Sequence, residues 1–310
     1  MTTLYYYHKD SLQHDTCLGH PESPDRLSYI NAALNQHGFD SLQRITAELR
    51  QDIMQIIQRV HTQAMIDKVL QKVPEDSYLS LDQDTVLSAG SAHAALLAVS
   101  AVCDAVDKVC NKQANNAFCA VRPPGHHAEP AQPMGFCLFN NVAIAAEYAR
   151  KLQKIKRIAI IDFDVHHGNG TQAVFENNAD VFYASTHEMP NYPGTGYPSE
   201  TGIGNIVNVA LASGDTGEQF REKYQQIIFP ALKQFKPDLI FLSAGFDAHK
   251  DDPLASIELD KQDYQWLSEE LMHIANNCCD GKIISVLEGG YNLYALAECV
   301  SAHIAVLMKA

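Results

Sequence analysis

The sequence contains no run of about eighteen apolar residues, the length that a membrane-spanning helix requires. Its N-terminal segment, MTTLYYYHKDSLQHD, becomes polar and charged too early for a secretory signal peptide. No internal repeat, low-complexity tract or long linker marks a domain boundary. We therefore expect a single domain over residues 1–310, located in the cytoplasm and not associated with a membrane.

Spaced cysteine pairs are also missing. The chain has 8 cysteines but no C-x-x-C pair, and Cys278 and Cys279 are directly adjacent. A disulfide framework or a zinc knuckle is built from spaced pairs, so this pattern favours reduced, mostly buried thiols of the kind found in the cytosol.

Basic residues are scarce, with 23 Lys and Arg against 37 Asp and Glu, a formal net charge of −14. A field of that sign repels phosphate backbones, so we expect no direct binding of nucleic acid. It attracts cationic partners such as lysine-rich peptides or polyamines, although the same charge also serves solubility alone.

The chain alternates helix-length segments with short apolar runs. Periodicity predicts helices over 89–110, 140–154, 218–235, 260–276 and 293–308, and strands over 117–121, 157–161, 181–184, 238–243 and 282–287. Pro230 should kink the third helix, and Asp260 is a suitable N-cap for the fourth. Strands separated by helices predict a parallel sheet with helices on both faces.

Clusters of Gly, His, Asp or Tyr follow these strands: RPPGHH, DFDVHHGN, STH, AGFDAHKDDP and EGGYN. Ordinary turns explain the glycines in these segments but not the repeated histidines. In an open parallel sheet, ligands bind beyond the carboxyl ends of the strands, so we expect the clusters to converge on one site.

Asp164 and His166 are two residues apart at a strand end, so their side chains point to the same side. Asp247, after a later strand, is the best candidate for a third ligand. Two carboxylates and one imidazole leave positions open for water and substrate, which is typical of catalytic zinc, although Fe²⁺ or Co²⁺ also accepts this set. Asp162 is placed to orient a histidine from behind the ligands.

His126 and His127 are adjacent imidazoles near the predicted metal, so they cannot both be protonated at low cost and their pKa values should separate. That arrangement suits one general base and one partner that stays charged or donates a proton. Tyr291 follows a glycine pair after the last strand, where its phenol can donate to a developing oxyanion. We interpret His167 and His249 as structural.

Seven segments together resemble the zinc-dependent histone deacetylase and acetylpolyamine amidohydrolase family: HPESPDRL at 20–27, RPPGHH at 122–127, GFCLFNN at 135–141, DFDVHHGNGTQ at 162–172, YPGTG at 192–196, SAGFDAHKDDPLA at 243–255 and LEGGYN at 287–292. GNGTQ is typical of the class II-like branch, which includes bacterial histone deacetylase-like amidohydrolases. The resemblance implies the arginase–deacetylase fold, a three-layer α/β/α arrangement around a central, mostly parallel eight-stranded sheet.

The resemblance also implies residue roles. It places zinc at Asp164, His166 and Asp247, and catalysis at His126, His127 and Tyr291. It places substrate binding at Gly135, Phe136, Tyr192, Gly289 and Leu254, and a structural potassium ion at Asp162, Asp164, His166, Ser185 and Thr186. Asn169 stands where one branch of the family has an aspartate bonded to the second histidine, and it joins Asp162 behind the ligands and catalytic residues.

The activity implied is removal of acetyl or other acyl groups from the ε-amine of lysine in proteins or peptides. The alternative is hydrolysis of acetylated polyamines, but polyamine-selective relatives carry a glutamate where this chain has Leu254. An arginase-like enzyme with paired manganese is disfavoured because Gly168 stands where a bridging carboxylate would be needed. A binding protein that has lost catalysis is disfavoured because every expected catalytic residue is present.

Overall fold

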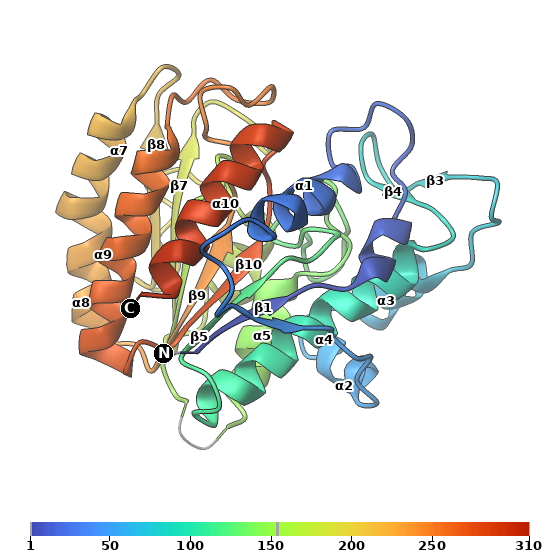
Figure 1. The fold of residues 1–310 in the computed structure, drawn as a ribbon, viewed down its shortest axis with the longest axis horizontal. Helices are drawn as coiled ribbons and strands as arrows, with labels where there is room; N and C mark the ends of the chain where they lie inside the picture. Colours follow the sequence, from blue (N-terminus) through green and yellow to red (C-terminus); the bar gives the residue numbers. More distant parts are fainter. Residues whose placement is uncertain (1, 153–154, 310) are drawn as a thin grey trace.

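The computed structural model describes residues 2–152 and 155–309. Within these residues, one 8-stranded sheet has the order β2-β1-β5-β10-β9-β6-β7-β8, and its neighbouring strands are parallel. Helices cover both faces of the sheet, giving the three layers that the sequence predicts (Figure 1). The end of the predicted helix over 140–154, at 153–154, and the terminal residues 1 and 310 of the predicted domain lie outside the described residues.

The strands of the large sheet are β1 (Thr3–Tyr6), β2 (Gln43–Ile45), β5 (Asn116–Cys119), β6 (Ile158–Asp162), β7 (Val181–Glu188), β8 (Ile206–Leu211), β9 (Leu239–Ala244) and β10 (Ile283–Leu287). A separate antiparallel hairpin pairs β3 (Leu79–Ser80) with β4 (Val86–Leu87). The predicted strands are all present, whereas β1, β2 and β8 were not predicted. Each of these three is an outer strand or lies next to one, and β2 is largely exposed, so little apolar patterning marks it.

Strand β7 is longer than predicted, because it continues through the STH segment to Glu188. Pairing of residues 185–188 with β8 extends the strand beyond its apolar part. Ser185 and Thr186 therefore lie within the strand and not in a turn after it, and their side chains face opposite sides of the sheet.

The helices are α1 (Asp25–Leu34), α2 (Ile53–Ile57), α3 (Gln63–Leu70), α4 (Ser91–Cys110), α5 (Asn141–Ala149), α6 (Asn169–Phe175), α7 (Gly217–Lys223), α8 (Phe229–Phe235), α9 (Lys261–Cys279) and α10 (Leu293–Leu307), with a short 3-10 helix at Lys9–Gln13. Apolar side chains of α2 to α6 join the core on one face of the sheet. Those of α1 and α7 to α10 join the core on the other face.

The helix predicted over 218–235 is interrupted by a π-helical turn at Tyr224–Ile228, between α7 and α8. Pro230 lies in the first turn of α8, where its missing N–H needs no partner inside the helix. The break therefore precedes Pro230 and is a widened turn, in place of the kink expected at the proline. Asp260 does cap α9, as predicted, and forms a capping box with Asp263.

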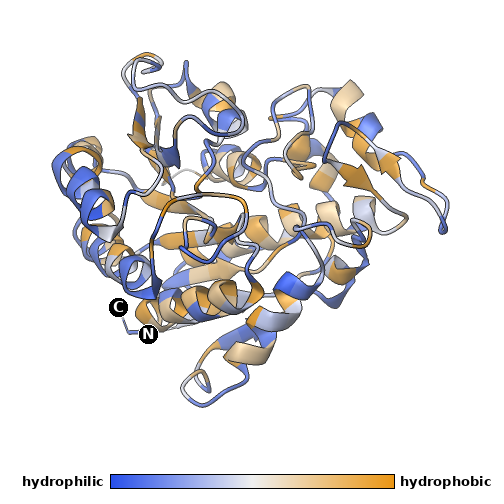
Figure 2. Ribbon diagram, turned by 90° about the horizontal axis from the view of Figure 1, so that it is seen from above, coloured by the Kyte–Doolittle hydropathy of each residue, from blue (hydrophilic) through white to orange (hydrophobic). Residues whose placement is uncertain are grey.

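The central strands are buried along their whole length, as parallel strands with helices on both faces must be. Figure 2 shows hydrophobic residues gathered between the layers and hydrophilic residues on the outer sides of the helices. Among the described residues, no helix is long and apolar enough to cross a membrane. The carboxyl ends of these rigid strands carry the polar clusters identified in the sequence.

Candidate active site

A cavity of about 240 Å³ opens among the loops that follow the carboxyl ends of the central strands. It is lined by Asp84, His127, Gly135, Phe136, His166, Asn191, Tyr192, Leu254 and Tyr291. The predicted substrate residues Gly135, Phe136, Tyr192 and Leu254 thus meet at one opening. Gly289 lies deeper, where its N–H donates to Asp164 Oδ2 at 2.8 Å.

The three predicted metal ligands meet at the bottom of this cavity. Asp164 and His166 follow β6, and Asp247 follows the neighbouring strand β9. Their ligand atoms all lie within 4.8 Å of one another, and all three residues are buried. His166 Nδ1 is 3.2 Å from Asp164 Oδ1 and 3.2 Å from Asp247 Oδ2.

Two glycines make room for these carboxylates. A Cβ on Gly245 would overlap the carboxylate of Asp164, and a Cβ on Gly289 would overlap that of Asp247. The chain can therefore approach the metal ligands this closely only where it has no side chain.

The electrostatics of the cluster fit a divalent cation. Burial, with Asp164 close by, raises the pKa of Asp247 to about 7. Burial disfavours a charged His166, but the hydrogen bonds that its Nδ1–H donates to Asp164 and Asp247 outweigh it and raise its pKa to about 10. Buried carboxylates need positive charge beside them, and two carboxylates with an imidazole are a donor set that zinc accepts. The residues present therefore fit the predicted ion.

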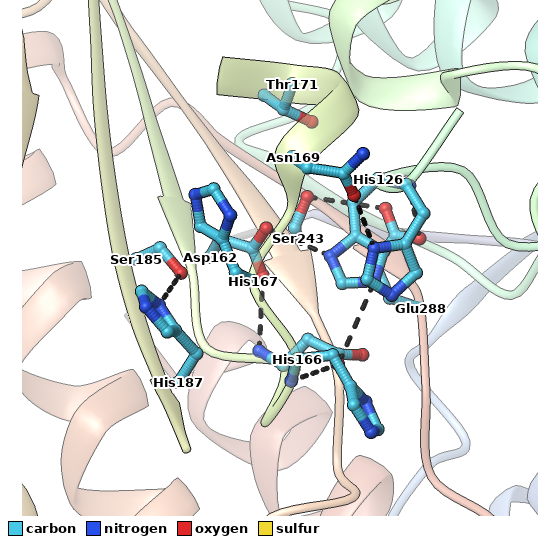
Figure 3. A network of polar contacts seen from close by, with 12 residues as sticks. His126, Asp162, His166, His167, Asn169, Thr171, Ser185, His187, Ser243 and Glu288 are labelled. Atoms are coloured by element: carbon cyan, nitrogen blue, oxygen red, sulfur yellow. Dashed lines mark hydrogen bonds and ion pairs between the residues drawn. The ribbon is translucent and has the colours of Figure 1, made fainter. Parts of the chain in front are cut away.

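His126 lies between the carboxylates of Asp162 and Asp164; Figure 3 labels His126 and Asp162. Its Nδ1 is 3.1 Å from Asp162 Oδ2, and its Nε2 is 3.8 Å from Asp164 Oδ1. Burial opposes a positive charge here, but Asp164 and Asp162 outweigh it and raise the pKa of His126 to about 10. These carboxylates therefore favour the protonated, charged form of His126.

His127 has the opposite electrostatics. Burial lowers its pKa well below the ordinary value, and the neighbouring His126 and His166 lower it further. Its Nδ1–H donates to Asn169 Oδ1 at 2.9 Å, and Asn169 Nδ2 donates to Glu129 Oε1 at 2.8 Å. Because Glu129 takes the amide N–H, the amide oxygen faces His127, which leaves Nε2 as the unprotonated nitrogen.

Tyr291 completes the polar end of the cavity. Its ring packs edge-on against Phe136, with centroids 5.8 Å apart, and the Arg26 guanidinium lies 5.2 Å from its centroid. Burial, with the carboxylates of Asp247 and Asp164, raises its pKa well above the ordinary value. The phenol therefore keeps its proton and remains a donor at neutral pH.

The residues predicted to hold potassium are only partly brought together. Asp162 and Ser185 are direct neighbours in the β6–β7 register, but the Ser185 hydroxyl is paired with His187 Nδ1 at 2.9 Å. The Thr186 hydroxyl faces the opposite side and lies 3.3 Å from the Tyr224 hydroxyl. A potassium site here stays a prediction.

The other predicted roles are placed as follows. His167 points away from the metal ligands, with Nδ1 2.8 Å from Thr195 Oγ1 and Nε2 2.9 Å from Gln172 Oε1. His249 Nδ1 accepts the N–H of Asp251 at 3.1 Å. The contacts of His167 and of His249 are those of structural histidines.

Several buried charges near the site were not singled out from the sequence. Arg26 Nη1 donates to Glu22 Oε1 at 3.0 Å, its Nε donates to the Gly290 carbonyl at 2.8 Å, and Nη2 donates to the Glu288 carbonyl. Arg122 Nη2 donates to Glu22 Oε2 at 2.8 Å. The only local signal is the four-residue spacing of Glu22 and Arg26 in HPESPDRL. Glu22 precedes α1, so the ion pair depends on the turn before the helix and not on a shared helix face.

The cavity rim adds Asp84 and Asn191, which no strand-end pattern marked. Asp84 comes from the loop between β3 and β4, and its carbonyl is 3.0 Å from His20 Nε2. Loop residues of this kind reach the site only through tertiary packing.

A parallel α/β sheet that carries a buried Asp–His–Asp cluster, a histidine pair and a tyrosine around one cavity at its carboxyl edge defines the class as an α/β enzyme of hydrolase type. A family model described as "Histone deacetylase domain" matches residues 20–307. The chain therefore belongs to the histone deacetylase family, whose members are deacetylating hydrolases.

Similar proteins match nearly the whole chain. The chain is 43% identical over 297 residues to an uncharacterized protein, slr0245, of Synechocystis sp., covering 95% of each chain. It is 38% identical over 298 residues to a protein named "Probable deacetylase" from Archaeoglobus fulgidus, covering 94% of this chain and 82% of that one. The crystal structure of the HDA15 HD domain superposes with a TM-score of 0.93 at 35% identity, covering 100% of this chain and 89% of that one.

The Glu22 cluster predicts a pH-dependent stability. Burial opposes ionisation of Glu22, but Arg122 and Arg26 lower its pKa from 4.5 to about 2. A lowered folded-state pKa means that the stabilisation is complete above pH 4.5 and is lost as the pH falls toward 2. Glu22→Gln should cost about 3–5 kcal/mol near neutral pH. This deficit should shrink by roughly 2 kcal/mol between pH 7 and pH 3.

Urea unfolding of wild type and Glu22→Gln, near pH 7 and again near pH 3, measures this difference. Exposed Glu48 provides the control variant Glu48→Gln, which should match wild type at both values. A deficit of Glu22→Gln that stays constant with pH would contradict the assigned ion pairs.

Proposed function

We propose that this chain is a zinc-dependent hydrolase that removes acetyl or other acyl groups from lysine ε-amines in proteins or peptides. The observation that carries the proposal is the single cavity in which aromatic walls, Phe136 and Tyr192, lead to His127, His166 and Tyr291. The apolar walls suit the aliphatic stem of lysine, while the polar groups meet the acyl amide at the bottom.

Asp164, His166 and Asp247 would hold the zinc ion. When bound there, zinc supplies Lewis-acid polarisation of the amide carbonyl and lowers the pKa of water. The amide is then hydrolysed between the groups that this chain provides.

His127 is the general base in this proposal. It is neutral, and its Nδ1–H is committed to Asn169, so Nε2 can take a proton from the attacking water. His126 stays positively charged against Asp162 and stabilises negative charge nearby. The two histidines therefore have different roles in this proposal: His127 transfers the proton, and His126 stabilises negative charge.

Tyr291 keeps its hydroxyl proton and donates it as a hydrogen bond to the carbonyl oxygen when negative charge develops there. The water oxygen bonds to the carbonyl carbon, the C–N bond breaks, and His127 returns its proton to the leaving nitrogen. The products are a free amine and a carboxylate.

Hydrolysis of acetylated polyamines is the second candidate. Asp84 at the cavity rim and the net charge of −14 favour any cationic substrate, a polyamine included. Leu254 at the same rim offers no carboxylate to a distant ammonium group, which favours acyl-lysine.

A substrate panel tests the proposal. Enzyme carrying zinc should hydrolyse an acetyl-lysine peptide with a higher kcat/KM than acetylputrescine or acetylspermidine, because the apolar walls and Leu254 contact an alkyl stem. Chelation should abolish turnover, and metal analysis should show one zinc per chain bound in wild type and lost in Asp247→Ala. Faster turnover of the polyamines would select the second candidate, and two metals per chain would contradict the single site.

Replacement of Tyr291 by Phe removes one oxyanion donor and leaves the ring in place. We expect kcat to fall by about 10²–10³ with a smaller change in KM. Tyr294→Phe is the matched control, since this nearby phenol is 77% exposed and should be dispensable. Wild-type turnover in Tyr291→Phe would remove Tyr291 from the mechanism.

Replacement of Asn169 by Asp places a carboxylate beside His127 Nδ1. The added negative charge favours protonated His127 and raises its pKa. Because the base must be neutral, the acid limb of the kcat/KM profile should move to higher pH. Asn277→Asp adds the same charge at an exposed position on α9 and should leave the profile in place. An unmoved acid limb in Asn169→Asp would exclude His127 as the base.

A further inference from the structure

Glu288 is a fully buried carboxylate at the carboxyl end of β10, outside the Asp164–His166–Asp247 cluster and outside the cavity wall. Its carboxylate has potential ligand atoms of His126 and Cys137 within 4.8 Å. Its Oε2 accepts the backbone N–H of Gly125 at 2.7 Å and that of His126 at 3.1 Å. The Ser243 hydroxyl donates to its other oxygen at 3.3 Å (Figure 3). The side chain therefore binds the backbone of the turn that carries the histidine pair.

The main chain of Glu288 leads to the other catalytic group. Gly289 and Gly290 connect it to Tyr291, and Arg26 donates to the carbonyls of both Glu288 and Gly290. One residue thus contacts the histidine turn through its carboxylate and carries the tyrosine loop on its backbone.

The outer side of the same two loops is joined by Glu22. It binds Arg26, which holds the tyrosine loop, and Arg122, the first residue of the histidine turn. Contacts therefore run in a closed ring from Glu22 through Arg122 and the turn to Glu288, and back through Arg26. In this ring, Glu288 makes the bonds nearest to the reacting groups.

We infer that Glu288 is a positioning residue that fixes the separation between the His126–His127 pair and Tyr291. The inference rests on the proposed hydrolase function. General base and oxyanion donor must reach opposite ends of one amide, and a misplacement of about 1 Å in such a site costs about 10²-fold in rate. In this inference, the position of the carboxylate oxygen, which accepts hydrogen bonds from two backbone N–H groups, matters more than the charge of the carboxylate.

Two substitutions separate reach from charge. Glu288→Gln keeps an oxygen at the same distance from the backbone and removes the charge. Glu288→Asp keeps the charge and withdraws the oxygens by one methylene. If Glu288 positions the turn, Glu288→Gln should keep most of the wild-type kcat, and Glu288→Asp should lose about 10²-fold in kcat with little change in KM.

Asp238, the residue before β9, provides a matched control. It lies at the amino end of its strand, whereas Glu288 lies at the carboxyl end of β10. It too is a carboxylate whose Oδ2 accepts two consecutive backbone N–H groups, those of Lys156 and Arg157, at 2.9 and 2.8 Å. Asp238→Ala should lower the melting temperature but keep kcat. Zinc content should match wild type in all three variants, so that turnover is compared per metal-loaded chain.

Amide hydrogen exchange gives a readout that does not depend on turnover. Glu288→Asp should speed exchange in both 122–128 and 288–292, whereas Glu288→Gln should leave both segments protected. Wild-type kcat in Glu288→Asp, equal loss in both variants, or unchanged exchange would each overturn the inference. A wild type inactive on every acyl-amine substrate would instead refute the proposed function, and the exchange result would still decide the positioning role.

Discussion

The attraction between two buried carboxylates and a cation is the constraint on which the site depends. Asp164 and Asp247 project from adjacent parallel strands toward His166, where water cannot solvate them. Buried negative charge of this kind is stable only beside positive charge. Among the described residues, His126 and His166 lie beside these carboxylates, and the pKa values of both histidines are raised in turn.

The two adjacent histidines differ because of their partners. The carboxylates of Asp164 and Asp162 raise the pKa of His126, whereas burial, together with His126 and His166, lowers the pKa of His127 well below its ordinary value. The pKa values of two consecutive histidines on one backbone turn are therefore shifted in opposite directions. The assignment of acid and base roles follows from this difference and not from residue type.

The buried ion pairs that Glu22 forms with Arg26 and Arg122 lie at the outer edge of the same site. Arg26 and Arg122 are too far apart in sequence to form a local motif, yet one carboxylate binds both. Burying such charges adds little net stability, but it permits only one arrangement of the loops. Rigidity at the outer edge of the site then allows Glu288 to act on the geometry nearer to the substrate.

Much of this architecture could be predicted from local sequence, since buried strands and amphipathic helices have their own periodicities, and Asp164 and His166 share a face by spacing alone. The π turn before Pro230 and the extension of β7 required neighbouring elements, because pairing and packing override local preference. Tertiary structure decided three further features: the amide orientation of Asn169, the two contacts of Glu288, and the position of Asp84 at the rim of the cavity. Each joins segments distant in sequence, and hydrogen bonds across such distances leave no periodic pattern in the chain.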